Sequence, residues 1–138
     1  MPERYVIQVW ESYEYDKDGK LLYYLYFPIN SSTAHAFNIR NKDTVIVKVH
    51  KIRGSYAEKY EPITEVNTEY PFEVYEYASR TGDQMVGLKI STEFVNTVGV
   101  REGDYIDLSL VSLKQMDKLV PIYPDAIRWG FRPYGFQD

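Results

Sequence analysis

Residues 87–110 read GLKISTEFVNTVGVREGDYIDLSL, and this stretch decides the fold. It begins as an apolar strand, after which Ser91 stands where the N-cap of a helix is expected. The apolar residues of that short helix fall on one face, and they are Phe94, Val95 and Val98. Gly99 suits the left-handed residue that follows a helix end. Residues 101–104 then turn the chain, so the pattern predicts strand, short helix, turn and strand.

The same pattern occurs a second time, earlier in the chain. Residues 39–47 align with residues 100–108 at a constant offset (100 − 39 = 61), which places Arg40 on Arg101 and Asp43 on Asp104. The apolar positions keep the same register, in which Leu25, Phe27, Ile29, Phe37, Val45, Val47 and Val49 meet Val86, Leu88, Ile90, Val98, Ile106, Leu108 and Leu110. Because this register holds without a gap, we predict an internal duplication.

Each half of the chain predicts a β-β-α-β unit, and the 138 residues fit a single domain. Repeat 1 covers about residues 4–52, with strands at 5–15, 20–29 and 44–52, and repeat 2 covers about residues 71–113, with strands at 71–78, 84–90 and 105–113. Residues 53–70 are expected to connect the repeats. The predicted fold class is mostly β, a small closed barrel of two pseudo-symmetric repeats with two short helices and an irregular C-terminal tail over residues 114–138.

The composition excludes several classes of protein. There is no cysteine, so disulfides and Cys-based metal sites or nucleophiles are excluded, and 14 tyrosines favour strands. No apolar run approaches the roughly 20 residues that span a bilayer, and the start MPERYVIQVW lacks the features of a signal peptide. We therefore expect a cytoplasmic protein that does not bind membranes. Absence of cysteine together with abundant Tyr, Lys and Glu also suits a thermophilic source.

A short capped helix followed by Gly-Val-Arg-Glu-Gly-Asp and a strand resembles the AbrB/MazE/SpoVT family of swapped-hairpin DNA-binding domains. The family pattern is roughly G-R-I-x-I-P, a helix ending in L-G-I, then K-E-G-D and a strand. The resemblance covers residues 86–110 well and residues 25–49 loosely. It implies a cradle-loop barrel in which both units lie in one chain, and a transcriptional regulator that binds duplex DNA. Double-psi barrels and archaeal riboflavin kinases share this ending, so the swapped-hairpin and double-psi topologies both stay open.

Basic residues in both halves are the DNA contacts that the resemblance implies. The candidates are Lys20, Arg40, Lys48, Arg80, Lys89, Arg101, Arg128 and Arg132. An alternative for Arg40 and Arg101 is that they offset helix C-terminal carbonyls or pair with nearby aspartates. The hairpin arginine of the family falls on Tyr26 and Gly87 here, and the net charge is −4. Both observations favour the alternative function, a protein-interaction or structural module on the same barrel.

The C-terminal tail interleaves arginine with aromatic residues. Such residues stack on bases, form protein interfaces or fold back over an open barrel end. The candidate interface residues, for a protein partner or for self-association, are Trp129, Phe131, Tyr134 and Phe136.

The sequence offers no catalytic constellation. His35 and His50 lie at no recognised metal-ligand spacing, and a triad of Ser31, His35 and Asp43 lacks an elbow motif. No phosphate-binding loop or dinucleotide fingerprint occurs. We therefore expect neither an enzyme nor a bound metal or cofactor.

Overall fold

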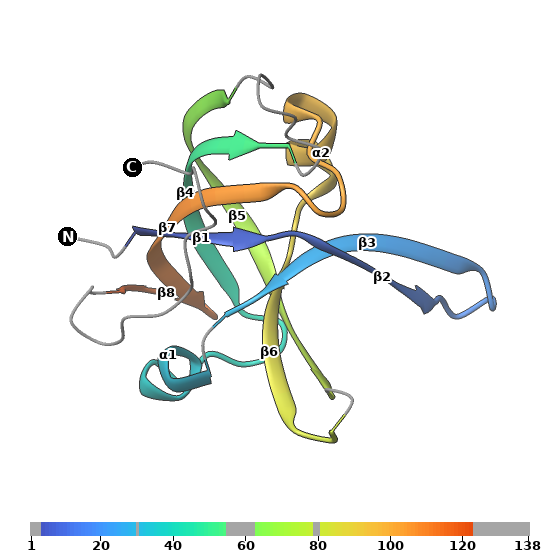
Figure 1. The fold of residues 1–138 in the computed structure, drawn as a ribbon. Helices are drawn as coiled ribbons and strands as arrows, with labels where there is room; N and C mark the ends of the chain where they lie inside the picture. Colours follow the sequence, from blue (N-terminus) through green and yellow to red (C-terminus); the bar gives the residue numbers. More distant parts are fainter. Residues whose placement is uncertain (1–3, 30, 55–62, 79–80, 123–138) are drawn as a thin grey trace.

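The computed structural model describes residues 4–29, 31–54, 63–78 and 81–122 (Figure 1). It is mostly β, as the sequence predicts. Its elements in chain order are β1 (Arg4–Gln8), β2 (Trp10–Tyr15), β3 (Leu21–Pro28), α1 (Ser31–Ala36), β4 (Thr44–Arg53), β5 (Thr64–Ala78), β6 (Gln84–Lys89), α2 (Thr92–Val98), β7 (Tyr105–Gln115) and β8 (Lys118–Pro121).

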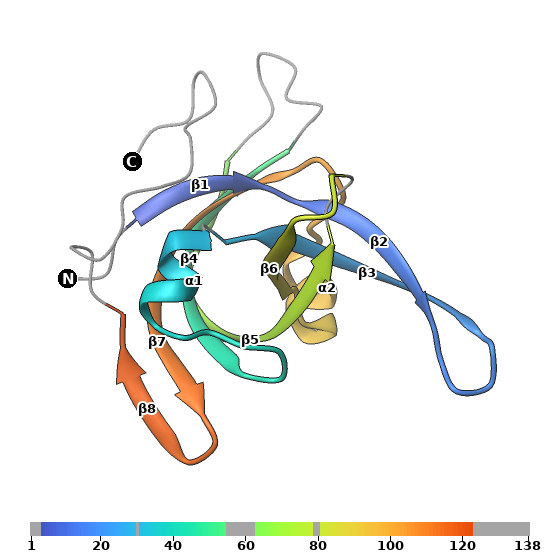
Figure 2. The same ribbon diagram turned by 90° about the horizontal axis from the view of Figure 1, so that it is seen from below.

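The strands form one antiparallel sheet of eight strands in the order β1-β7-β4-β5-β6-β3-β2, with β8 also paired to β7. The sheet curls but is not closed, which corrects the closed barrel predicted from the sequence (Figure 2). The physical reason is a break at Val9 in the strand expected over residues 5–15. Val9 exchanges backbone hydrogen bonds with Gly103 and Asp104, which directly precede β7, at 2.7 and 2.8 Å. The chain therefore pairs with β7 before Val9 and with β3 after it, and no ladder joins β1 to β2 among the described residues. Thus β1 and β2 stand at opposite ends of the strand order.

The core lies inside the curl of the sheet. Along β4 the burial alternates, and Val45, Val47 and Val49 point inward and are fully buried. Phe72 packs its ring against those of Phe27 and Phe94, with centroids 6.1 and 5.6 Å apart. Full burial of side chains of this size stabilises the fold by about 1.5–3 kcal/mol each. The core therefore joins strands from both halves of the chain to α2.

The two helix-to-strand turns have the same hydrogen bonds. The Asp43 carboxylate accepts from the Arg40 N–H, and the Asp104 carboxylate accepts from the Arg101 N–H, both at 2.8 Å. Each aspartate N–H also donates to the carbonyl of the matching arginine, at 3.1 Å. The two aspartates therefore fix the turns through backbone N–H groups.

The caps predicted for the second helix are also confirmed. The Ser91 hydroxyl accepts from the Phe94 N–H at 3.2 Å. Gly99 adopts φ +81° and donates its N–H to the Val95 carbonyl. Phe94 is fully buried, so the helix is held by one large aromatic side chain.

Residues 61 apart in the sequence face one another across the sheet. Phe27 pairs with Leu88 between β3 and β6, and Lys48 pairs with Ser109 between β4 and β7. The Ile29 N–H donates to the Val86 carbonyl, and the Ile90 N–H donates to the Leu25 carbonyl. Ile29 and Ile90 are 61 residues apart, as are Leu25 and Val86, so the two hydrogen bonds join matching positions. The internal duplication itself stays a prediction.

Two segments expected to be irregular contain strands. β4 reaches Arg53 and β5 begins at Thr64, so strand replaces much of the expected connector 53–70, of which residues 55–62 lie outside the described part. A positive φ of 48° at Asn67 lies opposite a register shift in β4, and such a bulge lets a long strand bend. Residues 118–121 form β8 because Met116, at φ +55°, starts a tight turn after β7. Residues 123–138 of the predicted tail lie outside the described part.

Candidate functional site

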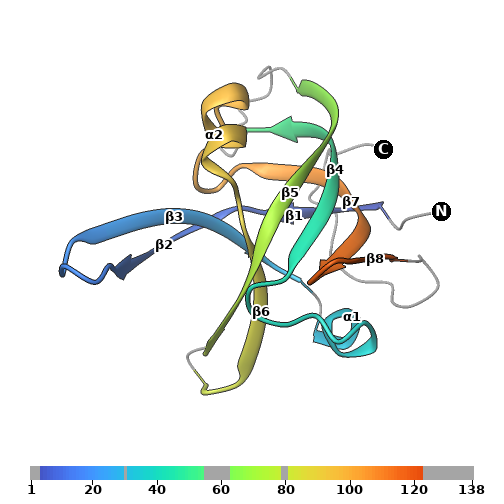
Figure 3. The ribbon, with the colours of Figure 1, turned by 180° about the vertical axis from the view of Figure 1, so that it is seen from behind.

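β2, β3 and the turn between them form a hairpin that projects from the body of the molecule, and we call residues 10–28 the arm (Figure 3). The turn is fixed by Asp16, whose carboxylate accepts from the N–H groups of Asp18 and Lys20, both at 2.8 Å. Gly19 at φ +78° completes it. This turn over residues 16–19 joins the strands that the sequence predicts at 5–15 and 20–29, and it sets the register of the arm.

The arm carries much of the exposed apolar surface of the described residues. Six of the ten large hydrophobic side chains that are exposed belong to it, namely Trp10, Tyr13, Tyr15, Leu21, Leu22 and Tyr23. Tyr13 pairs across the strands with Tyr23, with ring centroids 6.4 Å apart, and Tyr15 pairs with Leu21. Contiguous exposed apolar surface rimmed by polar residues marks interaction sites.

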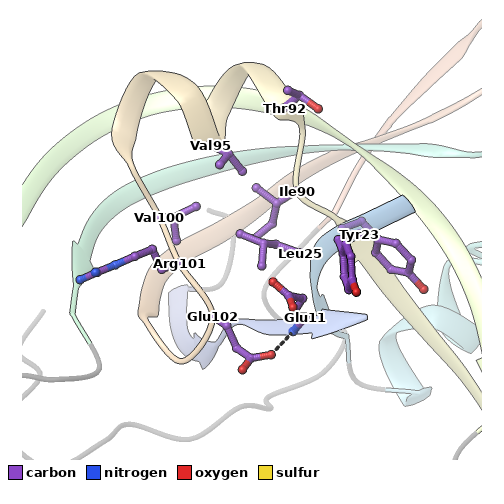
Figure 4. A pocket seen from close by; sticks show the side chains of 10 residues that line it. Glu11, Tyr23, Leu25, Ile90, Thr92, Val95, Val100, Arg101 and Glu102 are labelled. Atoms are coloured by element: carbon purple, nitrogen blue, oxygen red, sulfur yellow. Dashed lines mark hydrogen bonds between the residues drawn. The ribbon is translucent and has the colours of Figure 1, made fainter. Parts of the chain in front are cut away.

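A groove lies at the base of the arm, beside α2, and we call it the α2 groove (Figure 4). Its volume is about 650 Å³. Its lining residues are Glu11, Tyr23, Tyr24, Leu25, Ile90, Thr92, Val95, Val100, Arg101 and Glu102. Glu11 and Leu25 form a cross-strand pair on the face of the arm that also holds Tyr13 and Tyr23. The exposed aromatic face of the arm therefore runs directly into the groove.

Two carboxylates stand at one side of the α2 groove. The Glu102 carboxylate accepts from the backbone N–H of Glu11 at 2.9 Å, which brings the turn after α2 against the edge of β2. Figure 4 shows the Arg101 guanidinium directed away from both glutamates. The groove thus combines an apolar floor with an acidic side, an arrangement that suits an apolar group attached near a cation.

A second, smaller groove lies beside α1, and we call it the α1 groove. Its volume is about 300 Å³, and its lining residues are Ala34, His35, Asn38, Ile39, Arg40, Glu76, Gln84 and Val86. Several of them match the α2 groove at the offset of 61, with Arg40 matching Arg101, Gln84 matching Tyr23 and Val86 matching Leu25. The Arg40 side chain donates to Asn38 Oδ1 at 2.9 Å. The α1 groove is the more polar of the two.

Tyrosines cluster where β3 and β5 lie on either side of β6. The rings of Tyr24, Tyr26, Tyr75 and Tyr77 lie with neighbouring centroids 5.1–6.0 Å apart. We call these four residues the tyrosine cluster. Gly87 lies beneath it, and a Cβ there would come within 3.1 Å of the Phe27 carbonyl and of the Tyr75 ring. Tyr26 and Gly87 are the positions on which the arginine of the AbrB-like pattern falls. In this chain Tyr26 belongs to the tyrosine cluster and Gly87 lies beneath it.

Burial raises the pKa values of three tyrosines of the cluster. It raises the pKa of Tyr77 to about 12, with a further contribution from the negative charges that Tyr26 and Tyr24 would carry when ionised. Burial also raises the pKa values of Tyr75 and Tyr26 above the usual range. Tyr26, Tyr75 and Tyr77 therefore stay neutral at physiological pH.

The predicted DNA contacts do not gather on one surface among the described residues. Arg40 and Arg101 are exposed but belong to separate grooves beside α1 and α2, at opposite ends of the molecule (Figure 1). Lys20 is exposed at the turn of the arm, and Lys48 lies on β4 between Glu69 and Ser109. Arg80, Arg128 and Arg132 lie outside the described residues, as do the predicted interface residues Trp129, Phe131, Tyr134 and Phe136.

Lys89 is the predicted contact with the clearest partners. Its ammonium lies 3.0 Å from the Glu14 carboxylate and 4.6 Å from the centroid of the Tyr24 ring. An ammonium held by a carboxylate and a ring face is less available to a phosphate.

Other kinds of site receive no support from the described residues. No group of three or more His, Asp or Glu side chains among them could hold a metal ion. His50 Nε2 lies 2.8 Å from the Ser109 hydroxyl, and Ser109 is buried. In the part of the chain that the structure describes, neither helix has the length and apolar character needed to cross a membrane.

Comparisons of the chain with protein-family models, with curated proteins and with solved structures found no match. The resemblance to the AbrB-like family therefore stays a prediction, and the site has to be interpreted from its own geometry.

Neither the arm nor the α2 groove was predicted from the sequence. The available signal was the pair of tyrosine-rich strands on either side of the turn at residues 16–19, which read SYEY and LLYYLY. In a half-buried strand one face is polar, whereas in LLYYLY apolar and aromatic residues occupy both faces. That pattern is typical of a strand with apolar side chains left over on its outer face.

Proposed function

We propose that this chain is a protein-interaction module that binds a polypeptide segment in the α2 groove. The observation that carries the proposal is the continuity of the exposed aromatic face of the arm with an apolar groove of about 650 Å³. Clefts of about 300–1,000 Å³ with apolar walls and a few polar groups are typical ligand sites. Tyrosine supplies much of the contact area in protein interfaces, because it is large, rigid and amphipathic.

The lining of the α2 groove favours a partner segment in which an apolar side chain stands next to a basic one. Leu25, Ile90 and Val95 would contact the apolar side chain. Glu11 and Glu102 would attract a neighbouring Lys or Arg, and the net charge of −4 favours a basic segment over an acidic one.

The scaffold in this proposal is a duplicated, barrel-like unit in which each helix stands beside the hairpin of the other half. Residues of β5 and β6 line the groove beside α1, and residues of β2 and β3 line the groove beside α2. The matched turn bonds of Arg40 with Asp43 and of Arg101 with Asp104 support a common origin of the halves. We place the protein in the cytoplasm and assign it no enzymatic activity.

DNA binding of the AbrB-like kind is the second candidate function. The observation that favours it is the equivalent placement of Arg40 and Arg101, which are both exposed and could address a two-fold symmetric duplex. Two observations favour the protein-binding alternative: Tyr26 and Gly87, where the family has arginine, are packed within and beneath the tyrosine cluster, and Glu14 lies beside Lys89.

Fluorescence anisotropy with defined peptides tests the proposed function. The probes are fluorescein-labelled peptides of sequence GKLKFKG and GELEFEG, titrated with the intact chain. We expect saturable binding of the basic peptide and none of the acidic peptide. Tyr23→Ser should weaken binding about fivefold or more, because an aromatic interface residue commonly contributes over about 1 kcal/mol. Gln84→Ser, the matched change in the α1 groove, should leave binding unchanged. Equal binding of both peptides, or an effect of Gln84→Ser as large as that of Tyr23→Ser, would overturn the proposal.

The same measurement with pooled DNA fragments tests the second candidate. Phosphate-driven affinity falls steeply between roughly 50 and 200 mM salt, so titrations at both concentrations are informative. We expect no binding even at the lower salt concentration. Salt-sensitive binding that is weakened by the double change Arg40→Ala and Arg101→Ala would instead support a DNA-binding regulator.

A further inference from the structure

The outer edge of β2 is unpaired within the described residues, since β2 ends the strand order. The hydrogen-bond pattern of the arm tells which backbone groups face that edge. The Asp16 N–H donates to the Lys20 carbonyl at 2.9 Å, so residues 16 and 20 form a hydrogen-bonded pair. Because such pairs alternate along an antiparallel ladder, the backbone groups of Glu11, Tyr13 and Tyr15 point outward. The bond from the Glu11 N–H to Glu102 agrees with this alternation.

β2 is less protected than β8 against edge pairing. Native sheets discourage unwanted pairing with short edge strands, charged side chains (lysine above all), proline or a covering segment. The charged residues of β2 are Glu11 and Glu14. β8, which lies beside β7 only, has such features, because it is four residues long and holds Lys118 and Pro121. β2 has six residues, WESYEY, with neither lysine nor proline. Tyr13 and Tyr15, at 59% and 66% exposure, are available beside the open backbone groups.

We propose that a second copy of this chain pairs with β2 in antiparallel fashion, about a two-fold axis at Tyr13. In that register the two Tyr13 residues exchange N–H···O=C bonds, and each Tyr15 N–H reaches the Glu11 carbonyl of the other copy. The arms then form one continuous four-stranded sheet, β3-β2-β2-β3. A two-fold contact of this kind closes on itself, so it yields a dimer and not a fibre.

Charge complementarity selects this register over its neighbours. With Tyr13 on the axis, Glu11 faces Tyr15 and Ser12 faces Glu14, so no carboxylate opposes another. A shift toward the tip of the arm places Glu14 opposite Glu14, and like charges directly opposite destabilise a sheet. A shift the other way, with Ser12 on the axis, uses the N–H groups of Tyr13 alone, because Glu102 already engages the Glu11 N–H at 2.9 Å and Tyr15 would face Val9, whose backbone groups bond Gly103 and Asp104. The register with Tyr13 on the axis uses the N–H groups of both Tyr13 and Tyr15.

The dimer goes beyond the proposed function, because it uses the backbone edge of β2 and not the α2 groove. It explains why Tyr13 and Tyr15 are exposed on a strand with open hydrogen-bonding groups: in the pairing, the Tyr13 side chains of the two copies become direct cross-strand neighbours. Strand addition at a free edge is a common mode of recognition between chains.

Sedimentation velocity of the intact chain from roughly 1 to 100 μM, a range that brackets micromolar affinities, tests the dimer. We expect a reversible shift from one to two copies. Tyr13→Pro should abolish it, because proline removes an N–H that faces outward while leaving the ladder to β3 intact. Circular dichroism of the variant confirms that it is folded. Tyr105→Phe, a change on β7, is the matched control and should leave the dimer intact.

Charged substitutions at Tyr13 test whether the two Tyr13 residues meet at the two-fold axis. Tyr13→Lys and Tyr13→Glu should each be monomeric, because like charges would meet at the axis, and an equimolar mixture of the two should form the dimer again. A wild-type chain that stays monomeric throughout the range overturns the dimer and leaves the peptide titrations to judge the proposed function independently. A dimer that persists in Tyr13→Pro, or a mixture that stays monomeric, overturns pairing at β2.

Discussion

The α1 and α2 grooves share several lining positions that match at the offset of 61, and they differ in what they can hold. The α2 groove has a volume of about 650 Å³ and an aromatic wall, whereas the α1 groove has about 300 Å³ and a polar lining. Tyr23 stands in the first where Gln84 stands in the second, and Val95 where Ala34 stands. The turns at their bases have matching hydrogen bonds. Side chains on a shared backbone plan therefore decide which groove suits a ligand.

The helices beside the two grooves differ in the same way. Phe94 of α2 is fully buried against Phe72 and Tyr70, with ring centroids 5.6 and 4.7 Å away. The residue at the matching place in α1 is Thr33, which is also buried, and its hydroxyl has no hydrogen-bond partner among the described residues. One helix is thus anchored by a large apolar group, while the other buries an unsatisfied polar one.

Phe94→Ala is expected to have the largest effect, because it removes the anchor of α2. Loss of a fully buried phenylalanine costs about 3–5 kcal/mol, so the free energy of unfolding should fall by that amount in urea denaturation. Phe37→Ala, near the end of α1, should cost less, because Phe37 is only partly buried. Equal losses from the two changes would contradict the difference between the helices.

Gly87→Ala is expected to have the next largest effect. The new Cβ would lie 3.1 Å from the Phe27 carbonyl and from Tyr75 Cε1, and 3.2 Å from Tyr77 Cε1. Relief of this overlap requires movement of the tyrosine cluster, at about 1–3 kcal/mol. Thermal unfolding followed by circular dichroism measures the loss. An unchanged midpoint would show that the close packing at Gly87 does not constrain the cluster.

Thr33→Val should stabilise the fold by about 1 kcal/mol, because it removes a buried hydroxyl without a partner and preserves the shape. The control is Thr97→Val on exposed α2 surface, which should stay within about 0.5 kcal/mol of the parent. Chemical denaturation of the three chains side by side decides between these outcomes. A loss of stability in Thr33→Val would show that the Thr33 hydroxyl has a partner that matters.

Alkaline pH should lower the stability of the fold through Tyr77, and this effect should be the smallest of the four. The folded-state pKa of Tyr77 is raised to about 12 from 10.0, so its contribution is complete below pH 10 and is lost as the pH rises from 10 towards 12. The unfolding midpoint should therefore fall over this window. In Tyr77→Phe the fall should be shallower, and identical profiles in the two chains would contradict the assignment.

Features of the fold that depend on neighbouring residues were predictable from the sequence, whereas features that depend on distant residues were not. Local chemistry identified the caps at Ser91 and Gly99 and the aspartate turns, because each depends on residues within a few positions. It did not predict that the first strand breaks at Val9, since that break is set by hydrogen bonds to the distant Gly103 and Asp104. The strands of the expected connector and of part of the tail were missed for a similar reason, because pairing with β4 and β7 outweighs their local turn residues.

The candidate site was harder to predict than the fold. The equivalence of Arg40 and Arg101 was visible in the sequence, but their separation at opposite ends of the molecule follows only from the fold (Figure 1). The α2 groove joins Leu25 to Val95 and Val100, which lie about seventy residues further along the chain. No local pattern places such residues around one cavity.

Methyl NMR spectra of the chain, titrated with the GKLKFKG peptide, test the central claim most directly. Methyl groups report on both grooves in one experiment, through Leu25, Ile90, Val95 and Val100 in one and Ala34, Ile39 and Val86 in the other. We predict saturable shifts confined to the α2 groove and the adjoining face of the arm. Shifts that are larger in the α1 groove, or shifts absent from both, would contradict the assignment of the α2 groove as the binding site.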